Sequence, residues 1–289
     1  MYNLGQTFRK IRNTKGLTLD EVANGEFSLS MLSKFENGKT QISVEKLNKA
    51  LSNMHVSIEE FYYIARELEY DEYTKFISEI DILYYNKDRV ALKSRYDAEL
   101  KLSETNKYGR FNILNSIIIA SKIKFLDKSF EIEEEHIKVL YDYLFGIEAW
   151  GEYEMTLLIN AVDFMSAKIY LLYAKEMLKK AEYFKYIGNV MNLIQISLIH
   201  GVSISIDQDY EEGAKYFIEK AKEYIKGGRD VHMIIVYIFT EGYYLTYKGN
   251  IEAGKNKVNE AINIFRRVGD IKSAEYYENE YKKYLEELN

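Results

Sequence analysis

Apolar side chains recur every three to four residues in long stretches of this chain, the spacing that places them on one face of an α-helix. In the first such stretch Leu4, Phe8 and Ile11 form the apolar face, and Gly16 ends the helix. Four further helices are predicted within the first 66 residues, each beginning at a Ser or Thr that can cap its first turn: Thr18, Ser28, Ser43 and Ser57. Proline, which often marks strand edges and loops, is absent. We therefore predict an almost entirely α-helical protein.

The last third of the chain repeats with a period of 40 residues. One face of the repeated helix carries small, branched and small residues in turn: Ala174, Ala214 and Gly254; Leu178, Ile218 and Val258; Ala181, Ala221 and Ala261. Small residues on one face let a neighbouring helix approach closely. Helix pairs joined by turns such as Gly249-Asn250 would stack into an α-solenoid that is loosely similar to tetratricopeptide repeats. Earlier segments with helical spacing would extend the array: 73–85, 88–102, 110–126, 133–145 and 152–171.

Charge divides the chain into two parts. Residues 1–66 hold nine Lys/Arg and seven Asp/Glu, whereas the rest of the chain holds 30 and 38. An acidic body repels a polyanion, while a small basic head can lie against one. In this head two short helices are joined by a tight turn, and the second begins with small polar residues, which is the arrangement of a helix-turn-helix. We therefore expect a helix-turn-helix DNA-binding domain over residues 1–66 and a helical-repeat domain over residues 67–289.

The composition argues against catalysis and against bound metals or cofactors. No cysteine is present, which removes disulfides, thiolate metal sites and a cysteine nucleophile. No metal-binding pair forms among the four dispersed histidines, His55, His136, His200 and His232. Asp207 and Asp209 alternate like the start of a calcium loop, but Glu212 stands where such a loop requires glycine. We expect no enzyme, no catalytic residue, no metal site and no cofactor.

The sequence also predicts where the protein works. No uninterrupted apolar run approaches the roughly 20 residues that a transmembrane helix needs. The first residues are polar and lead into a basic helix, unlike a secretory signal. Because the chain also lacks cysteine, we expect a cytoplasmic protein that does not bind membranes.

Two stretches of the head carry a family resemblance. LGQTFRKIRNTKGLTLDEVA followed by SLSMLSKFENGK resembles the lambda-repressor-like helix-turn-helix, also called the XRE type. FSLSMLSKFENGKTQIS together with HVSIEEF resembles the Rgg/MutR/GadR branch of transcriptional regulators. The resemblance covers residues 1–63 and implies a five-helix DNA-binding domain followed by a repeat domain similar to tetratricopeptide repeats.

The resemblance implies DNA-binding roles for residues of the head. Arg12 and Glu36 occupy positions that form a partly buried salt bridge in the superfamily, so we expect Arg12 to be structural first and a phosphate contact second. We expect Arg9, Asn37 and Lys39 to contact phosphates. The residues expected to reach base edges share the outer side of the recognition helix: Ser28, Leu29, Ser30, Ser33 and Lys34.

A head of this size makes few phosphate contacts, so one half-site would bind weakly and with strong salt dependence. Such domains work as dimers. We expect a homodimer on double-stranded DNA, bound to an inverted-repeat operator whose half-sites lie roughly 34 Å apart.

The resemblance also implies that the repeat domain binds a short signalling peptide, as in quorum sensing. Side-chain amides within apolar helices can satisfy the N–H and C=O groups of such a peptide together. Arg110 could receive a carboxylate. The expected amide contacts are Asn112, Asn115, Asn160, Asn189, Asn192 and Gln195. The alternative is the same fold controlled by a protein partner instead of a secreted peptide.

Overall fold

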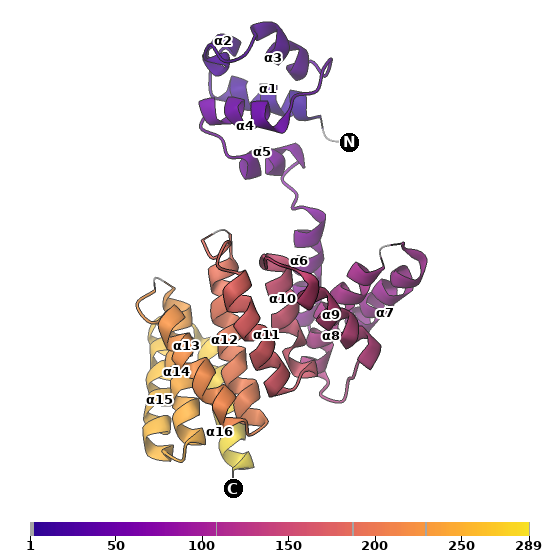
Figure 1. Cartoon of the computed structure of the whole chain (residues 1–289). Coiled ribbons are helices and arrows are strands. Elements are labelled where there is room, and N and C mark those ends of the chain that lie inside the picture. The colour runs from indigo at the N-terminus through magenta and orange to yellow at the C-terminus, as the bar shows by residue number, and fades with distance from the viewer. Residues whose placement is uncertain (1–2, 108, 187, 229, 289) are drawn as a thin grey trace. The chain divides into compact units, whose positions relative to one another are not determined.

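The computed structural model describes residues 3–107, 109–186, 188–228 and 230–288. Every regular element in these ranges is a helix, which confirms the predicted all-α fold (Figure 1). The chain divides into two compact units, Met1–Ile82 and Leu83–Asn289, and the division falls inside α6 (Glu72–Tyr85). Residue 66 follows directly on α5 (Ile58–Ala65). A domain boundary at residue 66 stays a prediction.

The first unit is a small bundle around one core. Before α5 and α6 it contains α1 (Leu4–Thr14), α2 (Leu19–Ala23), α3 (Leu29–Glu36) and α4 (Val44–Asn53). Each helix of the bundle from α1 to α5 contributes a large buried side chain: Phe8, Val22, Leu32, Leu47 and Phe61. The five predicted helices therefore share one hydrophobic core.

The predicted helix starts are confirmed by the capping contacts. Thr18 Oγ1 accepts a hydrogen bond from Glu21 N at 3.2 Å, and the Glu21 carboxylate accepts one from Thr18 N at 2.7 Å. Ser28 caps α3 in the same way, since its Oγ accepts from Met31 N at 3.2 Å. Between α2 and α3, Asn24 and Gly25 have φ values of 45° and 72°, the left-handed geometry that a tight turn requires.

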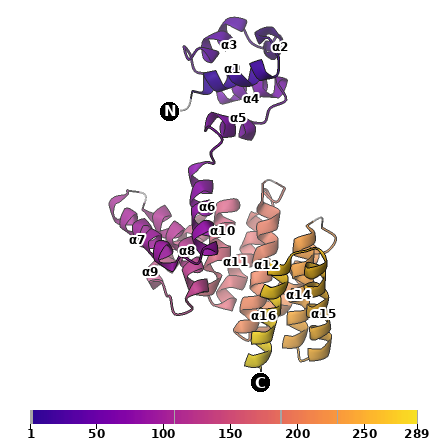
Figure 2. The same ribbon diagram turned by 180° about the vertical axis from the view of Figure 1, so that it is seen from behind.

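The second unit is an array of helix pairs (Figure 2). Its helices are α7 (Arg89–Thr105), α8 (Arg110–Leu126), α9 (Glu134–Gly146), α10 (Glu152–Ala161), α11 (Ala167–Lys180), α12 (Val190–Asp207), α13 (Glu211–Ile225), α14 (Val231–Tyr247), α15 (Ile251–Arg267) and α16 (Ile271–Glu287). Helices α8, α10, α12 and α14 contact one another in that order, and we call them the inner row. The inner row is the continuous core that a stacked repeat array requires.

One predicted element is wrong. The segment 152–171 has helical spacing throughout, but α10 ends at Ala161, a short 3-10 helix follows over Val162–Phe164, and α11 begins at Ala167. Ser166 starts α11 because its Oγ accepts a hydrogen bond from Ile169 N at 3.3 Å. The break separates an inner-row helix from α11, which packs against α12 and α13.

The small residues of the repeat allow close helix contact, as predicted. Gly242 on α14 and Gly254 on α15 face one another, and a Cβ on Gly254 would lie 2.7 Å from the Gly242 carbonyl oxygen. The same Cβ would lie 2.1 Å from Thr246 Oγ1. Real side chains essentially never approach this closely, so only glycine fits at residue 254 with the two helices at this distance.

Helix α12 is both long and strongly apolar. Its 18 residues, Val190–Asp207, are long and hydrophobic enough to cross a membrane by length and composition alone. More than half of this helix is buried, because α10, α11, α13 and α14 surround it. Its apolar character is therefore that of a core helix, filled by residues such as Leu198 and Val202.

We predict that Gly254→Ala lowers the free energy of unfolding of the repeat domain by about 1–3 kcal/mol, because the new methyl group overpacks the α14–α15 contact. Gly146→Ala is the matched control, since a Cβ at this helical glycine meets no atom within 4 Å. Urea unfolding followed by circular dichroism measures both variants. Equal stability of the two variants would contradict the packing argument.

Candidate nucleic-acid interface and ligand-binding residues

The outer side of α3 faces solvent, and its inner side is buried. Leu32 and Phe35 point into the core, which leaves the opposite side of the helix free for a partner. Ser33 is half-buried at the border between the two sides. The other four residues predicted to reach base edges are exposed: Ser28, Leu29, Ser30 and Lys34.

A shallow recess runs beside this exposed side of α3. It is lined by Ser28, Ser30, Met31, Lys34, Thr40, Gln41, Ile42, Ser43 and Lys46. Lys34 and Lys46 make it cationic, and the hydroxyl and amide groups add hydrogen-bonding capacity. Lys46 was not predicted to bind DNA. Its position in the first turn of α4, three residues after the Ser43 cap, could have indicated that it lies beside α3.

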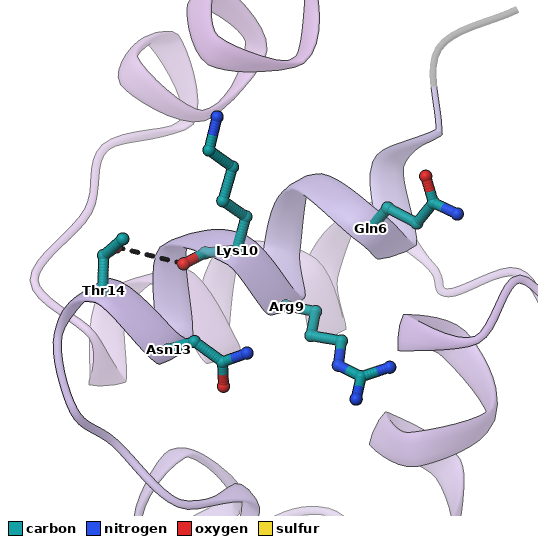
Figure 3. A pocket seen from close by; sticks show the side chains of 5 residues that line it. All are labelled: Gln6, Arg9, Lys10, Asn13 and Thr14. Carbon is teal, nitrogen blue, oxygen red and sulfur yellow. Dashed lines mark hydrogen bonds between the residues drawn. The ribbon is translucent and has the colours of Figure 1, made fainter.

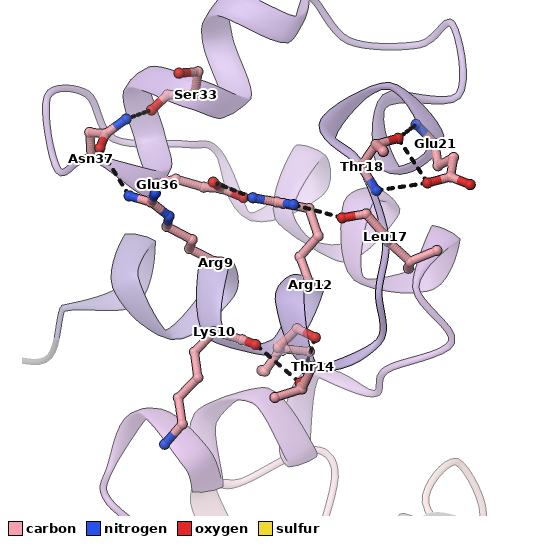
Figure 4. A network of polar contacts seen from close by, with 11 residues as sticks. Arg9, Lys10, Arg12, Thr14, Leu17, Thr18, Glu21, Ser33, Glu36 and Asn37 are labelled. Atoms are coloured by element: carbon pink, nitrogen blue, oxygen red, sulfur yellow. Dashed lines mark hydrogen bonds and ion pairs between the residues drawn. The ribbon is translucent and has the colours of Figure 1, made fainter.

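An ion pair fixes the position of α3 relative to α1 (Figure 4). Arg12 Nε donates to Glu36 Oε1 at 2.6 Å, and Arg12 Nη2 donates to Glu36 Oε2 at 2.9 Å. Arg12 Nη1 donates to the carbonyl oxygen of Leu17 at 2.6 Å, so the same guanidinium also holds the loop before α2. The hydrogen bond to Glu36 raises the pKa of Arg12, against the opposing effect of burial. The predicted salt bridge is therefore present, while a phosphate contact by Arg12 stays a prediction.

The three other predicted phosphate contacts lie near the C-terminal end of α3. Asn37 caps α3, and its Nδ2 donates to the Ser33 carbonyl oxygen at 2.7 Å. Arg9 Nη1 donates to Asn37 Oδ1 at 3.4 Å, which brings α1 and the end of α3 together. Lys39 is exposed two residues beyond the cap. The structure thus brings Arg9 and Asn37 into contact and leaves both open to solvent.

The exposed face of α1 continues this polar surface (Figure 3). Gln6, Arg9, Lys10, Asn13 and Thr14 line a shallow depression there. Only Arg9 was predicted to bind DNA, although the helical spacing already placed residues 6, 9, 10 and 13 on the face opposite to Phe8 and Ile11.

The predicted peptide-binding residues do not form one cluster. Asn115 accepts a hydrogen bond from the Tyr153 hydroxyl at 3.1 Å, which joins α8 to α10. Asn160 Oδ1 accepts from Ser121 Oγ at 2.7 Å and joins the same helices further along. Arg110 is exposed at the first turn of α8. Arg110, Asn115 and Asn160 thus all belong to the α8–α10 pair.

The other four predicted residues contact other elements. Asn112 Nδ2 donates to Glu99 on α7 at 2.7 Å, and Gln195 Nε2 donates to the Tyr224 carbonyl oxygen on α13 at 2.9 Å. Asn189 precedes α12, and its backbone N–H donates to Glu152. Asn192 Nδ2 donates to Asp230 Oδ2 at 3.2 Å. Asn112 and Gln195 are thus engaged with helices outside the inner row, and the peptide-binding roles of all seven residues stay predictions.

His200 on α12 is a polar residue of the inner row that the sequence did not single out for binding. Its Nδ1 is buried and has no hydrogen-bond partner in the part of the chain that the structure describes. Withdrawal of the ring from water lowers the pKa of His200, and the nearby Asp163 carboxylate opposes this effect. Neutral His200 is therefore the form that the folded state favours.

Comparisons with known proteins agree with this two-part architecture. Residues 8–61 match the helix-turn-helix family, and residues 98–279 match the C-terminal domain of the HTH-type transcriptional regulator Rgg. The second match spans more than half of the chain. The chain belongs to the Rgg family of helix-turn-helix transcriptional regulators. The family resemblance seen in the first 63 residues is thereby confirmed.

Solved structures similar to this Rgg-family chain cover it almost completely. The Streptococcus dysgalactiae SHP pheromone receptor Rgg2 is 28% identical with a TM-score of 0.78, covering 97% of this chain and 99% of its own. A protein from Listeria monocytogenes EGD-e is 24% identical with a TM-score of 0.84 (100% and 99%). The PrgX/cCF10 complex matches at 19% identity and a TM-score of 0.71 (98% and 99%). The last two similarities concern the fold alone.

We predict that Glu36→Gln lowers the free energy of unfolding of the first unit by about 2–4 kcal/mol, because it leaves a partly buried guanidinium without its counter-charge. Glu26→Gln is the matched control: Glu26 pairs with Lys49 at 3.1 Å on the exposed surface, where such a pair contributes at most about 1 kcal/mol. Hydrogen exchange of α1 and α3 amides measures the effect in the full chain. A loss no larger than that of the control would show that the ion pair does not hold the unit together.

We also predict a pH dependence that originates in His200. Because its pKa is lower in the folded state than the ordinary value of 6.5, stability is present above this value and falls as the pH drops below it. His200→Gln should remove this pH-dependent loss of stability. Between about pH 8 and pH 5 the free energy of unfolding of the wild type should therefore fall more than that of the variant. His55→Asn, at an exposed position with φ of 53°, is the control. A difference that stays constant with pH would exclude His200 as the source.

Proposed function

We propose that this regulator is a cytoplasmic, non-catalytic homodimer that binds an inverted-repeat operator through residues 1–66 and senses a short signalling peptide through residues 67–289. The observation that carries the proposal is the joining, in one chain, of an exposed and rigidly held α3 to an Rgg repeat domain. The similarity to a pheromone receptor along nearly the whole length of both chains supports the peptide.

In this proposal α3 enters the major groove of DNA. Lys34 donates to guanine O6 and N7, Leu29 contacts a thymine methyl group, and the Ser28, Ser30 and Ser33 hydroxyls serve neighbouring base edges. The exposure of Leu29, at 45%, supports this role, because an apolar side chain on a free surface gains from contact with a methyl group.

Phosphate contacts position α3 on the DNA. The phosphates of one strand are contacted near the end of α3 by Arg9, Asn37 and Lys39. The N–H groups of Arg12 that do not take part in its ion pair donate to a phosphate as well. Lys46 in the recess beside α3 adds a contact on the other side of the helix. The same positive surface on a second copy supplies the second half-site.

The repeat domain binds the peptide with side-chain amides of the inner row. Asn115 and Asn160 each make one hydrogen bond between α8 and α10, and Asn160 Nδ2 also donates to the Thr156 carbonyl oxygen at 2.8 Å. Each amide retains capacity for a peptide N–H or C=O group. Asn189, Asn192 and Gln195 on or beside α12, together with Asn112 and Arg110 on α8, extend the binding surface. Peptide binding shifts the population between dimer arrangements that differ in their fit to the operator.

We predict that Lys34→Ala weakens specific binding to the regulator's own upstream region by about tenfold or more, because one bidentate base contact accounts for about 1–3 kcal/mol. Lys39→Ala should weaken binding to all sequences alike and lower the salt dependence by about one phosphate contact. Lys226→Ala, an exposed lysine of the repeat domain, is the control.

Fluorescence anisotropy with a labelled duplex, titrated at several salt concentrations, separates these effects. If Lys34→Ala weakened binding to all sequences equally, Lys34 would contact phosphates and not bases. No specific binding by the wild-type protein, with or without peptide, would refute the proposed function.

A further inference from the structure

Arg110 is held against aromatic rings at the start of α8. Its guanidinium carbon lies 5.2 Å from the ring centre of Phe111 and 5.6 Å from that of Tyr143. Both distances are within the range of a cation–π interaction, and the side chain is exposed. The rings restrict the guanidinium without using its N–H donors.

The rings beside Arg110 form a rigid platform contributed by three helices. The ring centres of Phe111 on α8, Tyr143 on α9 and Tyr153 on α10 lie 5.8–6.2 Å from one another. The Tyr143 hydroxyl donates to Glu154 Oε1 at 2.6 Å, and the Tyr153 hydroxyl donates to Asn115 Oδ1 at 3.1 Å. The hydroxyl contacts fix the two tyrosines, so the platform exists before any ligand binds.

In the part of the chain that the structure describes, neither Arg110 nor Arg267 has a carboxylate partner, unlike three other arginines of the repeat domain. Arg89, Arg95 and Arg266 pair with Asp127, Glu99 and Glu278. Glu154, beside Tyr143, has both oxygens engaged, since Oε2 accepts from the backbone N–H of Gly151 at 3.0 Å. Within the described ranges, Arg110 makes ring contacts but no hydrogen bond or ion pair.

We propose that Arg110 receives the free α-carboxylate of the bound peptide, with the peptide's last side chain, an apolar one, on the exposed ring of Phe111. This inference rests on the proposed peptide-sensing function and adds the chemical class and direction of the ligand. A planar guanidinium that lies near aromatic rings and keeps its N–H donors unused matches a carboxylate, which can accept two parallel hydrogen bonds.

The surroundings of Arg110 favour the end of a peptide. Phe111 is 41% exposed, which offers apolar area directly beside the charge. Asn115 lies further along α8 and contacts Tyr153 of the platform, so a peptide that ends at Arg110 would place preceding backbone groups near this amide. Arg110, Phe111 and Asn115 thus follow one another along α8 in the order in which they would meet the C-terminal carboxylate, the last side chain and the backbone of a peptide.

The test uses the full-length protein and three mixtures of fluorescently labelled octapeptides built from Leu, Ile, Val, Phe and Gly. The first mixture has free C-terminal carboxylates, the second has C-terminal amides, and the third has C-terminal amides with one internal Asp. Fluorescence anisotropy gives an apparent Kd for each mixture. We expect the free acids to bind about tenfold more tightly than either amide mixture, the effect of one hydrogen-bonded ion pair.

Variants assign this preference to Arg110. Arg110→Gln should bind all three mixtures alike, Arg110→Lys should keep part of the preference, and Phe111→Leu should weaken binding of the free acids. Arg267→Gln, an exposed arginine of α15, is the matched control and should behave as wild type. Thermal unfolding of each variant verifies that the exposed substitutions leave the fold intact.

The outcomes separate the two proposals. Equal binding of free acids and amides by wild type, or a preference that persists in Arg110→Gln, would overturn the carboxylate site and leave peptide sensing in place. Equal binding of the Asp-containing amides and the free acids would assign the site to an acidic side chain and overturn C-terminal recognition. Binding of none of the three mixtures would overturn both proposals.

Discussion

The ion pair between Arg12 and Glu36 is the constraint on which the DNA-binding unit depends. One guanidinium ties α1 to the end of α3 and also holds the loop that leads into α2. A charge in this half-buried position is stable only with its partner, so the pair sets one arrangement of the three helices. The exposed residues of α3 are thereby presented on a fixed helix, and a fixed helix is what the reading of base edges requires.

In the repeat domain, the inner row is packed among other helices and also keeps polar side chains accessible to a ligand. Helix α12 is surrounded by neighbouring helices, yet polar residues of the row, such as Asn115, Asn160 and His200, remain partly accessible. Close glycine contacts between α14 and α15 allow the tight stacking of the last repeats. Together these features fit a domain that holds its shape while its polar side chains meet a ligand.

Local chemistry in the sequence was sufficient to predict most of the fold. The Thr18 capping box, the serine caps and the small residues of the 40-residue repeat each depend on neighbours close in sequence or on a regular spacing. Helical spacing could not show which neighbouring helix Asn112 and Gln195 contact, because that depends on how helices stack. For the same reason the aromatic platform was missed, since Phe111, Tyr143 and Tyr153 come from three different helices.

Hydroxyl-radical footprinting of the full-length protein on its own upstream region tests whether a symmetric dimer reads DNA through α3. We expect two protected half-sites related by twofold symmetry, with centres separated by roughly 34 Å or a multiple of it, because two copies of α3 would enter successive major grooves. A single protected site without symmetry, or uniform protection without sequence preference, would contradict a dimeric regulator that reads DNA through α3.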